Sequence, residues 1–186
     1  FCSSPCFYCG CNRVITRDHS RGASYVARVL AEADLLASHV DGRRQVIQLH
    51  LGGGTPNFLT LEAMTALVEG LRQRFTFSAS AARDFSIELD PRFVSRDDVA
   101  GLAALGFNRA SLGVQDFDPQ VQASINRIQG VAQTLDILQA CRDYGMRSVN
   151  VDLIYGLPGQ SLEGFGRTLQ QVLALRPDRL AVYGYA

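Results

Sequence analysis

Four of the five cysteines in this chain lie within its first eleven residues. They are Cys2, Cys6, Cys9 and Cys11, separated by three, two and one intervening residues. In a reducing compartment, cysteine clusters of this density are metal sites more often than disulfides. Three thiolates on one loop suit three corners of a cuboidal iron-sulfur cluster and leave its fourth iron open to a ligand.

Two other interpretations of the cysteines stay open at this point. One is a disulfide between close neighbours, and the other is a structural zinc site. A structural zinc site usually takes a second pair of ligands further along the chain. The only other cysteine is Cys141, which falls in a predicted helix and is expected to pack in the core.

Charge and composition exclude several classes of function. Eighteen basic residues balance eighteen acidic ones, so no overall field attracts nucleic acid or anionic lipid. Every basic residue is arginine, which excludes a Schiff-base lysine, a phosphate-loop lysine and a lysine general base. No apolar run is long enough to cross a bilayer, and no signal-peptide pattern is present. We expect a soluble cytoplasmic protein with no nucleic-acid or membrane partner.

Helices and strands are predicted to alternate along the whole chain. Apolar residues recur every three to four positions in the helical segments, and Thr60 and Ser95 are good N-caps. Gly106 and Gly145 are expected to end the helices before them. This alternation predicts one α/β domain with a parallel sheet and right-handed crossovers. The predicted helices are 25–40, 60–74, 95–106, 131–144 and 161–175, and the predicted strands are 45–51, 85–89, 109–114, 148–154 and 179–183.

One face of every predicted strand is polar at its carboxyl end. Residues two apart on a strand share a face. If the sheet curls into part of a barrel, these side chains line its interior near the carboxyl rim, where barrel enzymes place their active sites. An open doubly wound sheet with satisfied core polar groups is the alternative. Leaving so many polar groups buried without partners would cost about 1 to 3 kcal/mol each, which favours a wet or ligand-filled cavity. The polar residues are Gln48 and His50, Ser86 and Glu88, Ser111 and Gln115, Asn150 and Asp152, and Tyr183 and Tyr185.

Two motifs together resemble the radical S-adenosylmethionine (SAM) superfamily. Residues 2–9 read CSSPCFYC, with an aromatic residue before the third cysteine, and residues 52–56 read GGGTP after the first predicted strand. A narrower resemblance, over essentially the whole chain, is to the oxygen-independent coproporphyrinogen III oxidases, also called coproporphyrinogen dehydrogenases. Leu51 departs from that family's pattern, which often has tryptophan there. The narrower resemblance is carried by 9–12 (CGCN), 48–56 (QLHLGGGTP), 88–92 (ELDPR), 113–117 (GVQDF), 126–127 (NR), 150–158 (NVDLIYGLP) and 185–186 (YA).

The resemblance implies a fold and a set of cofactor ligands. The fold would be a partial (β/α)6 barrel, with residues 1–186 as the radical SAM core of a longer chain whose first strand precedes Phe1. Cys2, Cys6 and Cys9 would hold a 4Fe-4S cluster, and SAM would bind the open iron. The family is expected to hold two SAM molecules, and no side chain is predicted to be catalytic because the radical forms on SAM. The residues expected to bind SAM are Tyr8, Gly53, Gly54, Thr55, Glu88, Gln115, Arg127, Asp152 and Ala186.

Each of these side chains has a physical task in that interpretation. The glycines would let SAM approach the backbone without a Cβ in the way. Glu88 could accept a hydrogen bond from the SAM ammonium or a ribose hydroxyl. Arg127 could pair with a SAM carboxylate through two nitrogens. Tyr8 could stack on SAM or shield the cluster.

The same resemblance implies a reaction. Two propionate side chains of coproporphyrinogen III would lose carbon dioxide and become vinyl groups, giving protoporphyrinogen IX in heme biosynthesis. An electron donor such as flavodoxin or ferredoxin would be needed, and a monomer is expected. The alternative is the heme chaperone-like branch of the family, which binds and delivers heme. Cys11 and the pair 116–117 favour the oxidase, and Cys11 itself is not expected to bind the cluster.

Overall fold

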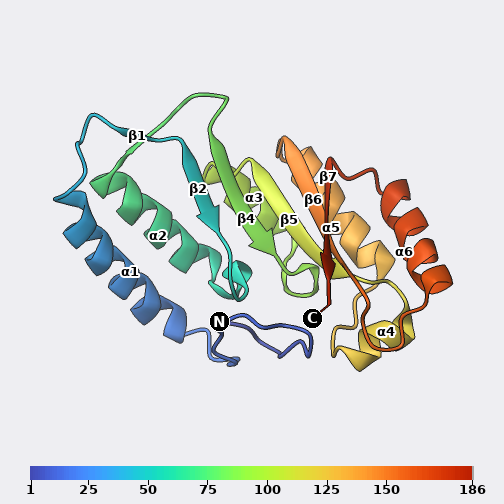
Figure 1. The fold of residues 1–186 in the computed structure, drawn as a ribbon. Helices are drawn as coiled ribbons and strands as arrows, with labels where there is room; N and C mark the ends of the chain where they lie inside the picture. The colour runs from blue at the N-terminus through green and yellow to red at the C-terminus, as the bar shows by residue number, and fades with distance from the viewer. Residues whose placement is uncertain (186) are drawn as a thin grey trace.

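Five parallel strands form the main sheet of the protein, in the order β2-β4-β5-β6-β7 (Figure 1). The computed structural model describes residues 1–185. Because successive strands of this sheet are neighbours, right-handed crossovers place the connecting helices on one face. A doubly wound sheet instead reverses its strand order at a switch point, and this sheet has no reversal. The strands are β2 (Gln48–Leu51), β4 (Asp84–Leu89), β5 (Arg109–Gln115), β6 (Ser148–Tyr155) and β7 (Arg179–Gly184).

The main core lies between this sheet and its helices. Ile87, Leu112 and Val151 are fully buried on three adjacent strands, and they belong to one apolar cluster with Met64 and Leu138 from the helices. This packing confirms the predicted α/β fold with a parallel sheet. The helices are α1 (Arg21–Ala37), α2 (Leu61–Arg74), α3 (Arg96–Ala104), α4 (Pro119–Ser124), α5 (Val131–Asp143) and α6 (Leu162–Ala174).

Caps confirm the predicted starts of α2 and α3 and the predicted position of Gly106 after α3. The hydroxyl of Thr60 accepts a hydrogen bond from the Ala63 backbone N–H at 3.2 Å. Ser95 forms a reciprocal capping box with Asp98. Gly106, just after α3, has a positive φ of 99°, a conformation that glycine adopts without a steric penalty.

The structure corrects the prediction near the start of the chain. The helix predicted at 25–40 begins earlier, at Arg21, and ends at Ala37. The strand predicted at 45–51 is divided into β1 (Gln45–Val46) and β2, because β1 leaves the main sheet and pairs with β3 (Thr76–Phe77). Four short elements were not predicted, because they are too short to show a hydrophobic period. They are the strand β3, the helix α4 and the two 3-10 turns at Pro56–Phe58 and Pro91–Phe93.

Eight of the ten residues predicted on the polar face of the sheet line one cavity of about 460 Å³, whereas Gln115 and Tyr185 do not. Neighbouring strands align its side chains in register, with His50 beside Ser86 and Glu88 beside Ser111. A bulge interrupts the pairing of β5 with β6 at Gly113–Gln115. The lining includes Gln48, His50, Ser86, Glu88, Ser111, Asn150, Asp152 and Tyr183.

The helices contain no candidate for a membrane span. Within residues 1–185, none combines the length and the hydrophobicity that crossing a bilayer requires.

Candidate functional site

The cysteine-bearing segment at the start of the chain runs across the carboxyl ends of the strands (Figure 1). Its backbone is fixed to two distant parts of the fold. The Thr55 N–H donates to the Phe1 carbonyl at 2.8 Å, and the Phe7 N–H donates to the Ile125 carbonyl at 3.0 Å. The cysteines are therefore held at the rim where parallel α/β folds place their active sites.

One small cavity at this rim gathers the residues predicted to bind SAM. Its volume is about 180 Å³, and Cys9 and Cys11 also line it. These residues come from six separate parts of the chain, so only the fold brings them together. Ala186 lies outside the described residues. The predicted residues that line the cavity are Tyr8, Gly53, Gly54, Thr55, Glu88, Gln115, Arg127 and Asp152.

The small cavity shares walls with two larger ones. Gly53, Gly54 and Thr55 also line a cavity of about 520 Å³ beside the N-terminal segment. Glu88 and Asp152 also line the cavity of about 460 Å³ on the polar face of the sheet. Both larger volumes fall within the range of about 300 to 1,000 Å³ that is typical of small-molecule sites.

Two carboxylates stand on adjoining parts of this site. Glu88 accepts a hydrogen bond from the Gly53 backbone N–H at 3.1 Å. Asp152 accepts from Ser111 at 2.8 Å and from Asn150 at 2.6 Å. Burial raises the pKa of Asp152, although these two hydrogen bonds act in the opposite direction. Both side chains retain acceptor capacity for hydroxyl or ammonium groups of a ligand.

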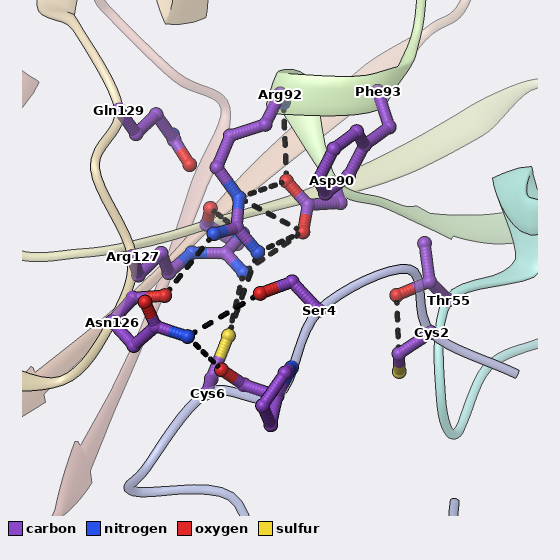
Figure 2. A network of polar contacts seen from close by, with 12 residues as sticks. Cys2, Ser4, Cys6, Thr55, Asp90, Arg92, Phe93, Asn126, Arg127 and Gln129 are labelled. Carbon is purple, nitrogen blue, oxygen red and sulfur yellow. Dashed lines mark hydrogen bonds and ion pairs between the residues drawn. The ribbon is translucent and has the colours of Figure 1, made fainter. Parts of the chain in front are cut away.

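Arg127 is buried, and its guanidinium group already has partners within the protein (Figure 2). Its Nη1 donates to Asp90 Oδ2 at 3.0 Å, and its Nη2 donates to the Gly113 carbonyl at 2.6 Å. A Cβ on Gly113 would lie only 3.0 Å from Nη2, so glycine permits this approach. The two-nitrogen pairing of Arg127 with a SAM carboxylate, predicted above, would therefore compete with Asp90.

Asp90 and Arg92 belong to the same network and were not predicted as site residues. Asp90 Oδ2 accepts from Arg92 Nη2 at 2.7 Å as well as from Arg127, and both guanidinium groups reach the sulfur of Cys6 (Figure 2). Burial alone would raise the pKa of Asp90, but the hydrogen bond from Arg92 and the charge of Arg127 outweigh it and lower that pKa. The sequence signal was the pair Asp90-Pro91 directly after a buried strand, which is a good start for a short helical turn.

Cys141 lies in the core as predicted, whereas the packing of Tyr8 against a second apolar cluster was not predicted. Tyr8 packs against the apolar cluster of Val121, Ile125, Ile154 and Leu157, and burial raises the pKa of its phenol. Cys141 is fully buried in α5, and burial raises the pKa of its thiol to about 12. A thiol in that environment stays protonated and unreactive at neutral pH.

The donor chemistry of the N-terminal segment fits an iron-sulfur cluster. All five cysteines are free thiols, and soft sulfur ligands are those that iron-sulfur clusters use. Cys2 Sγ accepts a hydrogen bond from the Thr55 hydroxyl at 3.5 Å, and Cys6 Sγ faces Arg92 and Arg127. Within residues 1–185, however, no three Cys, His, Asp or Glu side chains already converge as a metal site. Binding would have to draw the thiols together, as is common for sites that form with their metal.

Asp90→Asn is expected to lower the stability of the cluster-free protein at pH 7 by about 3 kcal/mol, because it removes the carboxylate from two buried guanidinium groups. The folded-state pKa of Asp90 lies below its ordinary value of about 3.9, so its contribution is present above that pH and is lost as the pH falls further. The difference from the parent protein should therefore shrink below about pH 4.

Urea unfolding at pH 7 and pH 3 measures this difference. Asp34→Asn is the matched control, because it removes a carboxylate from the exposed pair with Arg74. An Asp90→Asn variant no less stable than Asp34→Asn at pH 7 would contradict the role of the buried carboxylate.

Comparison with known proteins defines the class to which this fold and site belong. Residues 1–172 match the family model described as the radical SAM superfamily, and the chain belongs to that superfamily. The cofactors of the superfamily are a 4Fe-4S cluster and SAM, which are the cofactors predicted from the motifs.

Particular relatives narrow the comparison further. The chain is 46% identical over 186 residues to the oxygen-independent coproporphyrinogen III oxidase of Pseudomonas aeruginosa and 44% identical to that of Escherichia coli. It covers 40% of the length of each, and each alignment covers 100% of this chain.

Solved structures agree with this comparison. The E. coli coproporphyrinogen III oxidase, described as a radical SAM enzyme, superimposes with a TM-score of 0.95 at 43% identity, over 100% of this chain and 42% of that one. Methylornithine synthase shares the fold with a TM-score of 0.66 at 13% identity, over 100% of this chain and 51% of that one.

Proposed function

We propose that this chain is the radical SAM core of an oxygen-independent coproporphyrinogen III oxidase. The observation that carries the proposal is the single rim cavity in which eight predicted SAM-binding residues meet beside Cys9. Relatives that are 41 to 46% identical to this chain, over the 40% of their own length that it covers, bear that enzyme's name. The proposed substrate is coproporphyrinogen III, and the proposed products are protoporphyrinogen IX and carbon dioxide.

Cys2, Cys6 and Cys9 are the proposed cluster ligands. They lie on one segment that is tied to the glycine turn at one end and to the residue after α4 at the other. Cys11 is exposed at the mouth of the cavity and is left outside the ligand set, because a fourth thiolate would close the iron that SAM needs.

The remaining cavity residues are proposed to bind and orient SAM. Gly53 and Gly54 present backbone groups at the end of β2. Glu88 accepts from the Gly53 N–H through Oε2, and its Oε1 lies 3.5 Å from His50 Nε2 at the edge of the same space. Asp152 is fixed by Ser111 and Asn150 so that its carboxylate faces the same space. Room for two SAM molecules would come from the larger cavities that share these walls.

The chain's own contribution is placement and exclusion of water. When bound, the cluster and SAM supply the radical that removes a hydrogen atom from each reacting propionate. Tyr8 covers the cavity from the side of α4 and is backed by apolar residues, so it limits solvent at this wall. Arg127 holds the Gly113 carbonyl and keeps the bulge of β5 in place beside the site. An external one-electron donor and a monomeric state complete the proposal.

Product analysis with the full-length protein tests this function. Anaerobically reconstituted protein, SAM, a strong reductant and coproporphyrinogen III should yield protoporphyrinogen IX and two carbon dioxide molecules per substrate. Stoichiometric heme binding without any cleavage of SAM would instead support a heme carrier on the same fold. Zinc without iron or sulfide in anaerobically purified protein would contradict both functions.

A further inference from the structure

We propose that Arg92, held in place by Asp90, is a second cation on the Cys6 sulfur and raises the reduction potential of the cluster that Cys6 binds. This inference rests on the proposed function, because it takes Cys6 as a cluster ligand. It assigns to Arg92 and Asp90 a positioning and electrostatic task that concerns one corner of the cluster.

The Arg92 side chain is held by the carboxylate of Asp90, two residues earlier in the chain. Asp90 directly follows β4 and caps the short turn Pro91–Phe93, where Asp90 Oδ1 accepts from the Arg92 backbone N–H at 3.1 Å. The same carboxylate also accepts hydrogen bonds from the Arg92 side chain, from Nε at 3.0 Å and from Nη2 at 2.7 Å. The Arg92 and Asp90 side chains are only 11% and 7% exposed, so water does not substitute for these contacts. A paired, planar guanidinium of this kind has little freedom to turn away.

The charges in this buried group do not balance without Cys6. Arg92 and Arg127 carry one positive charge each, and Asp90 is the only carboxylate that forms an ion pair with either of them among residues 1–185. One positive charge therefore remains in a buried place, which is unfavourable unless an anion meets it. Arg92 Nη2 lies 3.5 Å from Cys6 Sγ, and Arg127 Nη1 lies 3.6 Å from it. Figure 2 shows the Cys6 sulfur facing both guanidinium groups, and a cluster-bound thiolate at Cys6 would supply the missing negative charge.

Among residues 1–185, no arginine hydrogen bond reaches the sulfur of Cys2, Cys9 or Cys11. Cys2 Sγ contacts the neutral hydroxyl of Thr55. The arginine nearest in sequence to Cys9 is Arg13, and it donates to the Cys9 backbone carbonyl rather than to the sulfur. The positive charge is thus concentrated on one ligand. Cluster potentials depend on net charge and on hydrogen bonds to the sulfurs, so both effects here favour the reduced cluster.

The test is a redox titration of the reconstituted full-length protein, followed by electron paramagnetic resonance. Arg92→Gln is expected to make one-electron reduction about tenfold less favourable, which corresponds to a midpoint about 59 mV lower. Arg92→Lys keeps the charge and should recover most of that shift. Arg13→Gln removes a charge from the cysteine segment without touching a sulfur, and its midpoint should stay near that of the parent protein.

Each outcome separates this inference from the proposed function. A parent protein that binds no cluster refutes the proposed function. A loaded Arg92→Gln protein with the parent's midpoint, or with the same shift as Arg13→Gln, overturns the inference and leaves the function standing. If Arg92→Gln folds but holds no cluster, Arg127→Gln removes the other cation and should lower the midpoint in the same direction. An unchanged midpoint in that variant also overturns the inference.

Discussion

Replacing Cys2, Cys6 or Cys9 by serine is expected to abolish both the iron-sulfur absorbance and the cleavage of SAM, whereas Cys11→Ser keeps the cluster. A serine oxygen is a hard, weakly acidic ligand that replaces a cluster thiolate poorly. Loss of one of three ligands leaves two, because the described residues offer no other thiol at the rim except Cys11. Iron and sulfide content, visible absorbance and 5'-deoxyadenosine formation from SAM measure the result after anaerobic reconstitution.

Cys141→Ser is the matched control for these cysteine variants. Cys141 is fully buried in α5 and remote from the rim cavity, so its replacement should leave iron content unchanged. A normal cluster in the Cys2→Ser protein would refute the ligand set. Loss of the cluster in Cys11→Ser, together with a normal cluster in one of the other three variants, would put Cys11 in the place of that cysteine in the ligand set.

Gly54→Ala is expected to reduce cluster loading severely, because the added Cβ collides with the backbone of the cysteine segment. A Cβ at this position would lie 2.8 Å from the Phe1 carbonyl oxygen and 3.0 Å from the Phe1 nitrogen. Backbone atoms cannot swing aside as a flexible side chain can, so the hydrogen bond between Thr55 and Phe1 has to lengthen or break. Overpacking of this kind typically costs about 1 to 3 kcal/mol.

The iron content of Gly54→Ala measures its cluster loading, and thermal unfolding measures its loss of stability. Gly10→Ala is the matched control, since Gly10 lies on the same cysteine segment and an added Cβ there meets no atom within 4 Å. Equal loading of the two variants would show that the glycine turn and the cysteine segment do not need this close approach.

The order of elements and the polar face of the sheet could be predicted from the sequence, because both depend on the spacing of apolar and polar residues along the chain. Helical spacing and alternation are local properties, and Thr60 and Ser95 mark helix starts through their own side chains. The division of the first strand could not be predicted in this way. Val46 leaves the main sheet because it pairs with Phe77, a partner that no local pattern identifies.

The sequence predicted which residues line the site better than it predicted the hydrogen bonds and ion pairs among them. Tyr8, Glu88 and Asp152 line the expected cavity. They could be predicted because cysteine spacing and strand parity are visible in the sequence. The network around Asp90 was missed because its contacts with Arg127 and Cys6 form only in the folded chain, and the run 88–92 by itself does not indicate them. Arg127 was selected for a contact with SAM, and its ion pair with Asp90 depends on the same long-range proximity.

The attachments of the cysteine segment also determine when the site can form during folding. Asn126 Nδ2 donates to the Pro5 carbonyl at 2.7 Å across 121 residues of sequence, and the Phe7 backbone bonds to Ile125. Contacts of such high contact order form late, because the intervening chain loses most of its entropy before they are made. The strands as far as β5 and the helix α4 have to be in place before the segment can dock. We therefore expect the cluster to be inserted only after this part of the fold has formed.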